Sequence, residues 1–287
     1  MLCKDSWIDV SWDGLPLRQS SENLLVTFNK KAKELLPFAS ACDRVAQEIY
    51  SQHNNLYLGM SGGSDSENVA NVFLRNNIPF TPIMLTYNVT YYSDQKLEMW
   101  WAQQWCKKNQ VTPLVIDIEN YANSPQEKQY TKIVKPRLGY GTVTYGRILD
   151  TVNQLGGQLV SGFQLEYYPD HEQMEYLRPV LGDYNGFVME ETDNYIETIA
   201  PGQHPWAFHY WSPEVMASFV NEWDTTLTMQ ENKAKIYGTV HRPKFGYHQD
   251  VFNPTVHKIR NKCKQYWGTR DCALLGSRES LLSQLLE

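Results

Sequence analysis

The sequence predicts an α/β fold in which helices cover both faces of a parallel sheet. Short apolar runs that end in glycine or polar residues alternate with longer segments whose apolar residues recur every three or four positions. Such alternation is typical of parallel sheets, because each crossover helix packs on one face of the sheet. The length of 287 residues, with 42% apolar and 20% charged residues, is that of a globular chain with a sizeable core and excludes a disordered one.

The alternation can be followed from residue 31 to residue 162. Apolar residues at helical spacing predict helices over 31–50, 66–76, 94–109 and 142–155. Short apolar runs predict strands over 56–60, 80–86, 112–118 and 158–162. Asp94 is the expected N-cap of the third helix, and Gly156 and Gly157 end the fourth.

The pattern changes after the fourth strand. Runs at 174–181 and 187–192 flank Asn185-Gly186, a dipeptide typical of tight hairpin turns, so we expect a β-hairpin insertion over about 172–193. Ser212 as N-cap and Pro213 as first residue open a further helix that runs to Trp223. We therefore expect a helical extension over 1–52, an α/β domain over 53–223, and a basic, helical C-terminal region over 224–287.

Composition narrows the class of protein and its partners. The net charge of −6 argues against general coating of nucleic acid. Residues 232–270 contain nine basic residues and one acidic residue, so nucleic acid is an open but not a favoured partner of this region. The five cysteines include no Cys-x-x-Cys pair, and neither a signal peptide nor a membrane span is visible, which predicts a reduced, cytoplasmic protein. A homo-oligomer stays open.

The segment richest in chemistry is Ser-Gly-Gly-Ser-Asp-Ser at residues 61–66, between a predicted strand and a predicted helix. Glycines let backbone N–H groups approach an anion, and the following helix N-terminus adds further donors. The Ser61 and Ser66 hydroxyls can donate to phosphate oxygens. Asp65 fits beside phosphates as a ligand of Mg²⁺, which takes one or two carboxylates plus phosphate oxygens. The residues alone therefore predict a site for magnesium pyrophosphate.

This motif, Ser-Gly-Gly-x-Asp-Ser, resembles the PP-loop of the ATP pyrophosphatases, the adenine nucleotide α-hydrolase-like superfamily. The resemblance covers about residues 55–170 and implies a Rossmann-like sheet of the PP-loop type. It also implies that ATP and Mg²⁺ bind on the loop, and that cleavage between the α- and β-phosphates transfers AMP to a substrate oxygen and releases pyrophosphate. The acceptor, a small molecule or a macromolecule, is not implied.

The resemblance also implies residue roles. Pyrophosphate would be held by Ser61, Gly62, Gly63, Ser64, Asp65 and Ser66. Asp65, through the metal, and Ser61 would be the catalytic residues. Adenine and ribose would meet the end of the second strand at Leu85 and Thr86, and the fourth strand would end at Gly162. The acidic residue expected shortly after that glycine is Glu166 or Asp170, and Glu166 is the expected second metal ligand.

Three alternatives stay open. Gly59-x-Ser61-x-Gly63 also matches the nucleophile elbow of serine hydrolases, with His204, His209 or His248 as the later histidine, although this leaves Asp65 and Ser66 without a role.

The sulfonucleotide reductase branch of the same superfamily is the second alternative. It resembles the chain at Pro205, Trp211 and Glu214-Val215, and would use Cys272 as its thiol. The glycine and histidine that flank that thiol are missing here, so a buried structural cysteine is favoured. The third alternative is a nucleotide-binding module without turnover.

Overall fold

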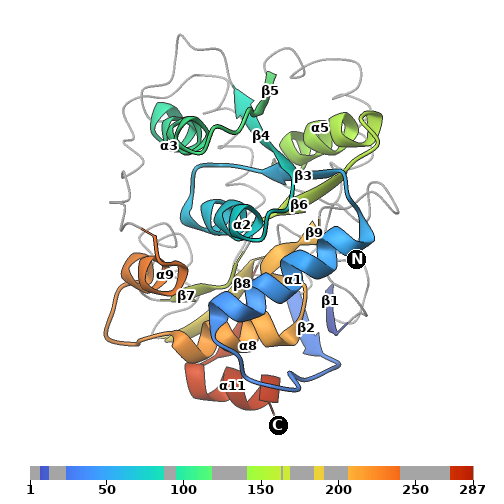
Figure 1. Cartoon of the computed structure of the whole chain (residues 1–287). Coiled ribbons are helices and arrows are strands. Elements are labelled where there is room, and N and C mark those ends of the chain that lie inside the picture. Colours follow the sequence, from blue (N-terminus) through green and yellow to red (C-terminus); the bar gives the residue numbers. More distant parts are fainter. Residues whose placement is uncertain are drawn as a thin grey trace.

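The computed structural model describes residues 7–12, 24–86, 95–117, 141–162, 164–168, 184–190, 206–239 and 272–286. A parallel sheet of five strands lies at the centre of the fold, in the order β5-β4-β3-β6-β9 (Figure 1). The strands are β3 (Leu56–Gly59), β4 (Phe80–Thr86), β5 (Leu114–Asp117), β6 (Gln158–Ser161) and β9 (Trp206–Ala207). The predicted parallel α/β sheet is confirmed.

Helices cover both faces of this sheet. Leu56 and Leu58 of β3 belong to a large cluster with the helices α1, α2 and α3, whereas Tyr57 packs with α5 in a second cluster. Successive side chains of a strand point to opposite faces, so α5 lies on the face opposite the other three helices. Their bounds are α1 (Phe38–Gln52), α2 (Ser64–Arg75), α3 (Gln95–Lys108) and α5 (Gly141–Gln154).

The first of these helices begins later than its apolar spacing predicts. The sequence suggests a helix from residue 31, but α1 begins at Phe38, with Pro37 as its N-cap in a non-helical conformation (φ −54°, ψ 137°). A proline disfavours helical dihedrals in the residue before it, which explains why Leu36 and its predecessors are excluded. The Phe38 N–H donates to Glu222 Oε1 at 2.6 Å, which satisfies one of the helix's first free N–H groups.

A second, antiparallel sheet corrects the predicted hairpin. It contains β7 (Glu166–Tyr168), β8 (Gly186–Glu190) and β10 (Cys272–Gly276), in the order β10-β8-β7. β7 pairs with β8 from Gly186 to Val188 on one edge, and β10 pairs with it from Phe187 to Glu190 on the other, so Asn185-Gly186 does not form the tight turn of a two-residue hairpin. Residues 174–181 themselves lie outside the described part. Gly186 is needed because a Cβ there would lie 2.3 Å from the Gly276 carbonyl oxygen.

The terminal segments complete the core. β1 (Ile8–Trp12) pairs antiparallel with β2 (Leu24–Phe28), so the extension expected to be helical also contains two strands. The C-terminal region contains the helices α9 (Met229–Tyr237) and α11 (Arg278–Leu286), and it also supplies the strand β10. Trp7 Nε1 donates to the buried carbonyl of Tyr210 at 3.0 Å, and the Ala32 N–H donates to the Leu285 carbonyl at 2.8 Å.

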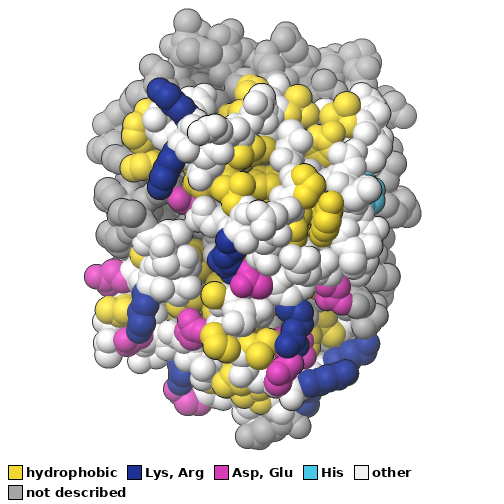
Figure 2. All heavy atoms as spheres, in the orientation of Figure 1, with side chains coloured by type: hydrophobic (Ala, Val, Ile, Leu, Met, Phe, Trp, Pro, Cys, Tyr) yellow, Lys and Arg dark blue, Asp and Glu magenta, His cyan; other side chains and the backbone are white. Residues whose placement is uncertain are grey.

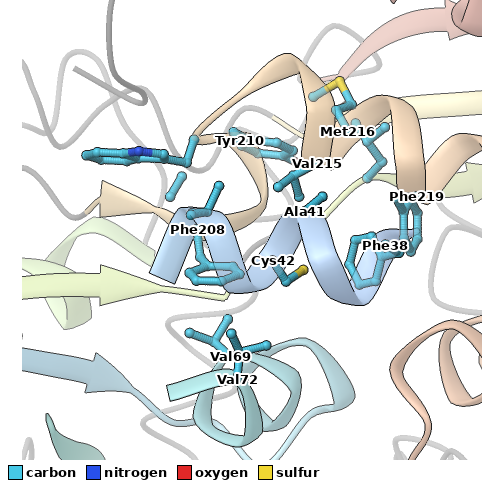
Figure 3. Packing of buried hydrophobic residues seen from close by; sticks show 14 of the residues in the cluster. Phe38, Ala41, Cys42, Val69, Val72, Phe208, Tyr210, Val215, Met216 and Phe219 are labelled. Atoms are coloured by element: carbon cyan, nitrogen blue, oxygen red, sulfur yellow. The ribbon is translucent and has the colours of Figure 1, made fainter. Parts of the chain in front are cut away.

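One hydrophobic cluster joins these segments. Figure 3 shows the α1 side chains Phe38, Ala41 and Cys42 among side chains from α2, the short 3-10 helix η5 (Phe208–Tyr210) and α8 (Pro213–Glu222). As predicted, Ser212 is the N-cap of α8 and accepts from the Val215 N–H at 3.4 Å. On the face in Figure 2, acidic and basic side chains are interspersed. In the described part of the chain, no helix is long and apolar enough to cross a membrane.

Candidate phosphate site at the end of β3

The loop after β3 lies where the strand order of the parallel sheet reverses. The chain passes from β3 through α2 to β4 on one side, and β6 joins β3 on its other side. In open parallel sheets, ligands bind outside the carboxyl ends of the strands at this reversal. Residues 60–63 occupy that position and lead directly into α2. The fold therefore places the Ser-Gly-Gly-Ser-Asp-Ser motif where such folds form a binding crevice.

The backbone of the loop depends on its two glycines. Gly62 has φ +91°, a conformation that glycine adopts without strain, and Gly63 is the N-cap of α2. The Gly63 N–H donates to Ser61 Oγ at 3.2 Å, and Ser66 Oγ donates to the Gly63 carbonyl at 3.1 Å. The hydroxyl oxygens of Ser61 and Ser66 lie 3.4 Å apart. The two hydroxyls are thus gathered at the N-terminus of a twelve-residue helix, where backbone dipoles favour an anion.

Gly162, just after β6, forms the other wall of this loop. A Cβ at Gly162 would lie 2.7 Å from Ser66 Cα and 2.8 Å from Ser66 N. The end of the fourth strand therefore packs directly on the first turn of α2, and only a residue without a side chain fits there. The strand β6 ends at Ser161, directly before Gly162, as expected, and this end of the strand lies against the phosphate loop.

Two carboxylates predicted to bind a metal meet beside the loop, and a lysine joins them. Lys233 Nζ lies 2.8 Å from Asp65 Oδ2 and 3.3 Å from Glu166 Oε1. Tyr237 donates its hydroxyl to the other oxygen of Asp65, Oδ1, at 2.6 Å. Lys233 is 2% exposed, so its charge is shielded from water. Sequence reasoning missed both Lys233 and Tyr237.

The electrostatics of this cluster fix the charge of the lysine. Burial alone would lower the pKa of Lys233, but the carboxylates of Asp65 and Glu166 outweigh it and raise that pKa above its ordinary value. Burial, followed by the negative charge of Asp65, raises the pKa of Tyr237 well above its ordinary value. At neutral pH the cluster therefore contains a protonated lysine, a neutral tyrosine that donates, and two acidic side chains around the ammonium.

The helix α9 carries both new residues on one face. Lys233 and Tyr237 are four positions apart, a spacing that puts side chains beside each other on a helix. Thr228 and Glu231 form a capping box at the start of α9, and Gly238 ends it in the left-handed conformation (φ 63°). The ring of Tyr237 stacks on Phe38 and on His209, with centroids 5.7 and 5.9 Å apart. The helix is thus fixed at both ends and along its buried face.

The residues predicted for adenine and ribose recognition lie at the same edge of the sheet. Leu85 and Thr86 end β4, where they pair with Ile116 and Asp117 of β5. Since β4 neighbours β3 in the parallel sheet, their backbone lies one strand away from the phosphate loop. Their side chains lie outside the described part of the structure.

Residues of the two rival enzyme classes have structural partners where they are described. His209 is fully buried, with Nε2 3.0 Å from Asn68 Nδ2. Trp211 Nε1 donates to Glu48 Oε2 at 2.9 Å, and Glu214 Oε1 accepts from the Lys33 N–H at 3.1 Å. The backbone of Cys272 begins β10, and its side chain is not described. Four further candidates lie outside the described residues: Asp170, His204, Pro205 and His248.

The donor set beside the loop fits a divalent cation of the magnesium type. Asp65 and Glu166 both lie close enough to contact one cation at the same point. Two carboxylates, together with phosphate oxygens, form a ligand set that Mg²⁺ accepts. In this structure the positive charge is the ammonium of Lys233. Within the described ranges, no group of three or more His, Cys, Asp and Glu side chains forms a metal cluster.

No protein-family model and no curated protein matches the sequence. Similar solved structures include an NH3-dependent NAD synthetase from Campylobacter jejuni with a nitrate ion, at 13% identity over 82% of this chain and 95% of that chain, with a TM-score of 0.38. The U34-tRNA thiolase NcsA from Methanococcus maripaludis, with its [4Fe-4S] cluster, is 13% identical over 70% and 71% of the two chains, with a TM-score of 0.37. A glutamine-dependent NAD+ synthetase from Acinetobacter baumannii, in complex with ADP, is 16% identical over 50% of this chain, with a TM-score of 0.35. The matched part spans 31% of that synthetase.

Proposed function

We propose that this chain is an ATP-dependent adenylating enzyme of the PP-loop type. The observation that carries the proposal is the position of the Ser-Gly-Gly-Ser-Asp-Ser loop: it joins β3 to the N-terminus of α2 where the strand order reverses, and Gly162 packs against it. That position combines the N-terminus of a helix, two hydroxyls and an aspartate. ATP binding with the triphosphate on residues 61–66 is the function that this set of groups supports best.

In the proposed reaction, an oxygen of the acceptor attacks the α-phosphorus of ATP in line with the bond to the bridging oxygen. The new P–O bond forms as the α–β bridge breaks, and pyrophosphate leaves with the electron pair of that bond. The loop N–H groups and the Ser61 and Ser66 hydroxyls neutralise the charge that grows on pyrophosphate. Such preorganised donors are a large part of catalysis in phosphoryl transfer.

Mg²⁺ is the metal proposed for this site, with Asp65 and Glu166 as its protein ligands. When bound, it would add positive charge at the leaving phosphates. Leu85 and Thr86 are proposed to meet the adenine and ribose through their backbone groups, at the carboxyl end of β4. The acceptor is proposed only as a class, an oxygen nucleophile such as a carboxylate or carbonyl oxygen that adenylation activates for a second attack.

The test distinguishes ATP binding from ATP turnover, and cleavage between the α- and β-phosphates from cleavage that releases ADP. Full-length protein is first heated with Mg²⁺ and ATP, ADP or AMP, and we expect ATP to raise the melting temperature most. D65N should abolish that rise, whereas the matched control D43N should keep it, because Asp43 is a half-buried residue of α1 paired with Arg75. ATP labelled at the α-phosphate is then incubated with pools of carboxylate-containing acceptors.

We expect labelled AMP or an AMP ester, together with pyrophosphate, as products. Formation of ADP and inorganic phosphate would contradict the proposed position of cleavage. Binding of ATP without products in any pool would instead favour the nucleotide-binding module. A melting temperature that no adenine nucleotide changes would contradict the nucleotide site itself.

A further inference from the structure

Lys233 occupies the position of the cation that Asp65 and Glu166 would otherwise share. Its Nζ is within hydrogen-bond distance of one oxygen of each carboxylate, and the side chain of the lysine is 3% exposed. The two carboxylates are themselves only partly exposed, at 23% and 19% of their side-chain surface. The site is thus a shielded pair of acids with one cation between them, supplied by the chain.

An ammonium and a divalent metal compete for these oxygens. Both would bind the same carboxylate oxygens. Two cations next to each other in a shielded site also repel each other strongly. Free Mg²⁺ also gives up its water ligands reluctantly. To bind the pair alone, it would have to expel a buried lysine, which would then need another acceptor of comparable charge. The triphosphate of a nucleotide is such an acceptor.

We propose that Lys233 is the resident counter-ion of the Asp65–Glu166 pair, that it keeps free divalent metal out of the nucleotide-free protein, and that it turns to the phosphates when a metal–nucleotide complex enters. The first two parts stand without the proposed function, and the third rests on it. The metal then enters this site only together with the nucleotide. Lys233 is in this sense a positioning residue: it decides when the two carboxylates become ligands.

The test measures Mn²⁺ binding to the nucleotide-free, full-length protein by the loss of the free Mn²⁺ signal in electron paramagnetic resonance. The variants are K233Q, which removes the charge but keeps an amide donor, and K235Q. Lys235 is the matched control, because it lies on the same helix but is exposed and paired with Asp224 at 3.3 Å. A double variant, D65N/K233Q, removes one of the two carboxylates as well.

We expect wild type and K235Q to leave the Mn²⁺ signal unchanged. K233Q should bind one Mn²⁺ per chain, roughly tenfold or more tightly than wild type, which is the scale of coupling between sites in proteins. D65N/K233Q should lose that binding. The α,β-methylene analogue of ATP, which cannot be cleaved between those phosphates, itself binds Mn²⁺, so its effect is measured as the manganese that stays with the protein on gel filtration. We expect the analogue to let wild type retain Mn²⁺ too, and D65N not to retain it.

Opposite results are equally specific. If wild type without nucleotide binds Mn²⁺ as tightly as K233Q does, and D65N removes that binding, the proposal is wrong while the nucleotide site stands. If K233Q folds but binds no Mn²⁺, or if it fails to fold both with and without Mn²⁺, a metal does not take the place of the lysine, and the proposal is also wrong. Failure of the ATP analogue alone to bring Mn²⁺ into wild type would contradict only the third part and the proposed function.

Discussion

Replacing Gly162 with alanine tests how closely the fourth strand must approach the phosphate loop. The added Cβ would lie 2.7 Å from Ser66 Cα, 2.8 Å from Ser66 N and 3.0 Å from Asp65 C. All three atoms are backbone, so no side-chain rotation can relieve the contact. The first turn of α2 must therefore move away from β6, or β6 from α2.

The distances give the size of the effect. Ordinary contact begins at 3.4 Å, so the backbone must shift by about 0.7 Å in a close-packed interior. Overpacking of this kind costs roughly 1–3 kcal/mol in the free energy of unfolding. The function should suffer more than the stability, because a misplacement of ~1 Å at a reacting site can reduce the rate about a hundredfold. The shift falls on Asp65 and Ser66, which are proposed to meet the pyrophosphate.

The assay compares G162A with G59A, in the same chain, by urea unfolding and by the rise in melting temperature that ATP causes. Gly59 ends β3, and a Cβ there would only touch the Val160 carbonyl oxygen at 3.8 Å. We expect G59A to retain the wild-type response to ATP and G162A to lose most of it while staying folded. A G162A protein with wild-type stability and a wild-type response to ATP would show that the loop does not depend on close contact with Gly162. That result would contradict the proposed site.

Two further predictions concern stability outside the loop. Hydrogen bonds from the Thr226 side chain and backbone, followed by the hydrogen bond from Lys235, lower the pKa of Asp224 to about 2. The stabilisation by this carboxylate is therefore fully present above its ordinary pKa of 3.8 and is lost as the pH falls towards 2. D224N should therefore flatten the fall in the urea midpoint between these pH values, and an unchanged slope would refute the role of this carboxylate. Leu281 of α11 is fully buried, so L281A should lower the free energy of unfolding by about 2–5 kcal/mol, and a loss below ~1 kcal/mol would show that α11 is not part of the core.

The parts of the fold that sequence reasoning predicted depend on local signals. The strand at 56–60, the glycine-rich turn and the helix after it follow one another within twenty residues, and each has its own periodicity or turn chemistry. The N-cap at Ser212 is likewise a local signal, and it is confirmed. Gly162 was placed at the site by resemblance rather than by spacing, since its contact with Ser66 joins residues far apart in the sequence.

The second sheet could not be predicted in the same way. Asn185-Gly186 favours a tight hairpin, but β8 pairs with β7 on one edge and with β10, more than eighty residues further on, on the other. A period of two residues identifies a strand but not its partner. Pairing with the distant strand β10 brings β8 into the hydrophobic cluster that contains Phe187, Ala273 and Leu281. The free energy gained by burying these apolar side chains outweighs the local preference for a tight turn.

Lys233 was missed because it is one of nine basic residues spread over residues 232–270, and charge alone does not distinguish it from the other eight. One sequence signal could have singled it out. In Met229–Tyr237 the residues Met229, Lys233 and Tyr237 recur at intervals of four, so a lysine shares a helical face with two large apolar or aromatic residues. A lysine on such a face is predicted to be buried, and a buried lysine needs an acid. Asp65 is a candidate for that acid, because a carboxylate in an anion-binding loop itself needs a positively charged partner.

The contacts of Asp65 also limit how the site can change state. Both of its oxygens accept from α9, one from Lys233 and the other from Tyr237. If a metal–nucleotide complex draws the lysine away, the tyrosine still stacks on Phe38 and His209 and still donates to Oδ1. The capping box and Asn232, which donates to the carbonyl of Asp224 at 2.8 Å, continue to hold the start of the helix. The exchange therefore requires rotation of one long side chain rather than undocking of α9, so Y237F should loosen the helix without releasing Lys233 from the two carboxylates.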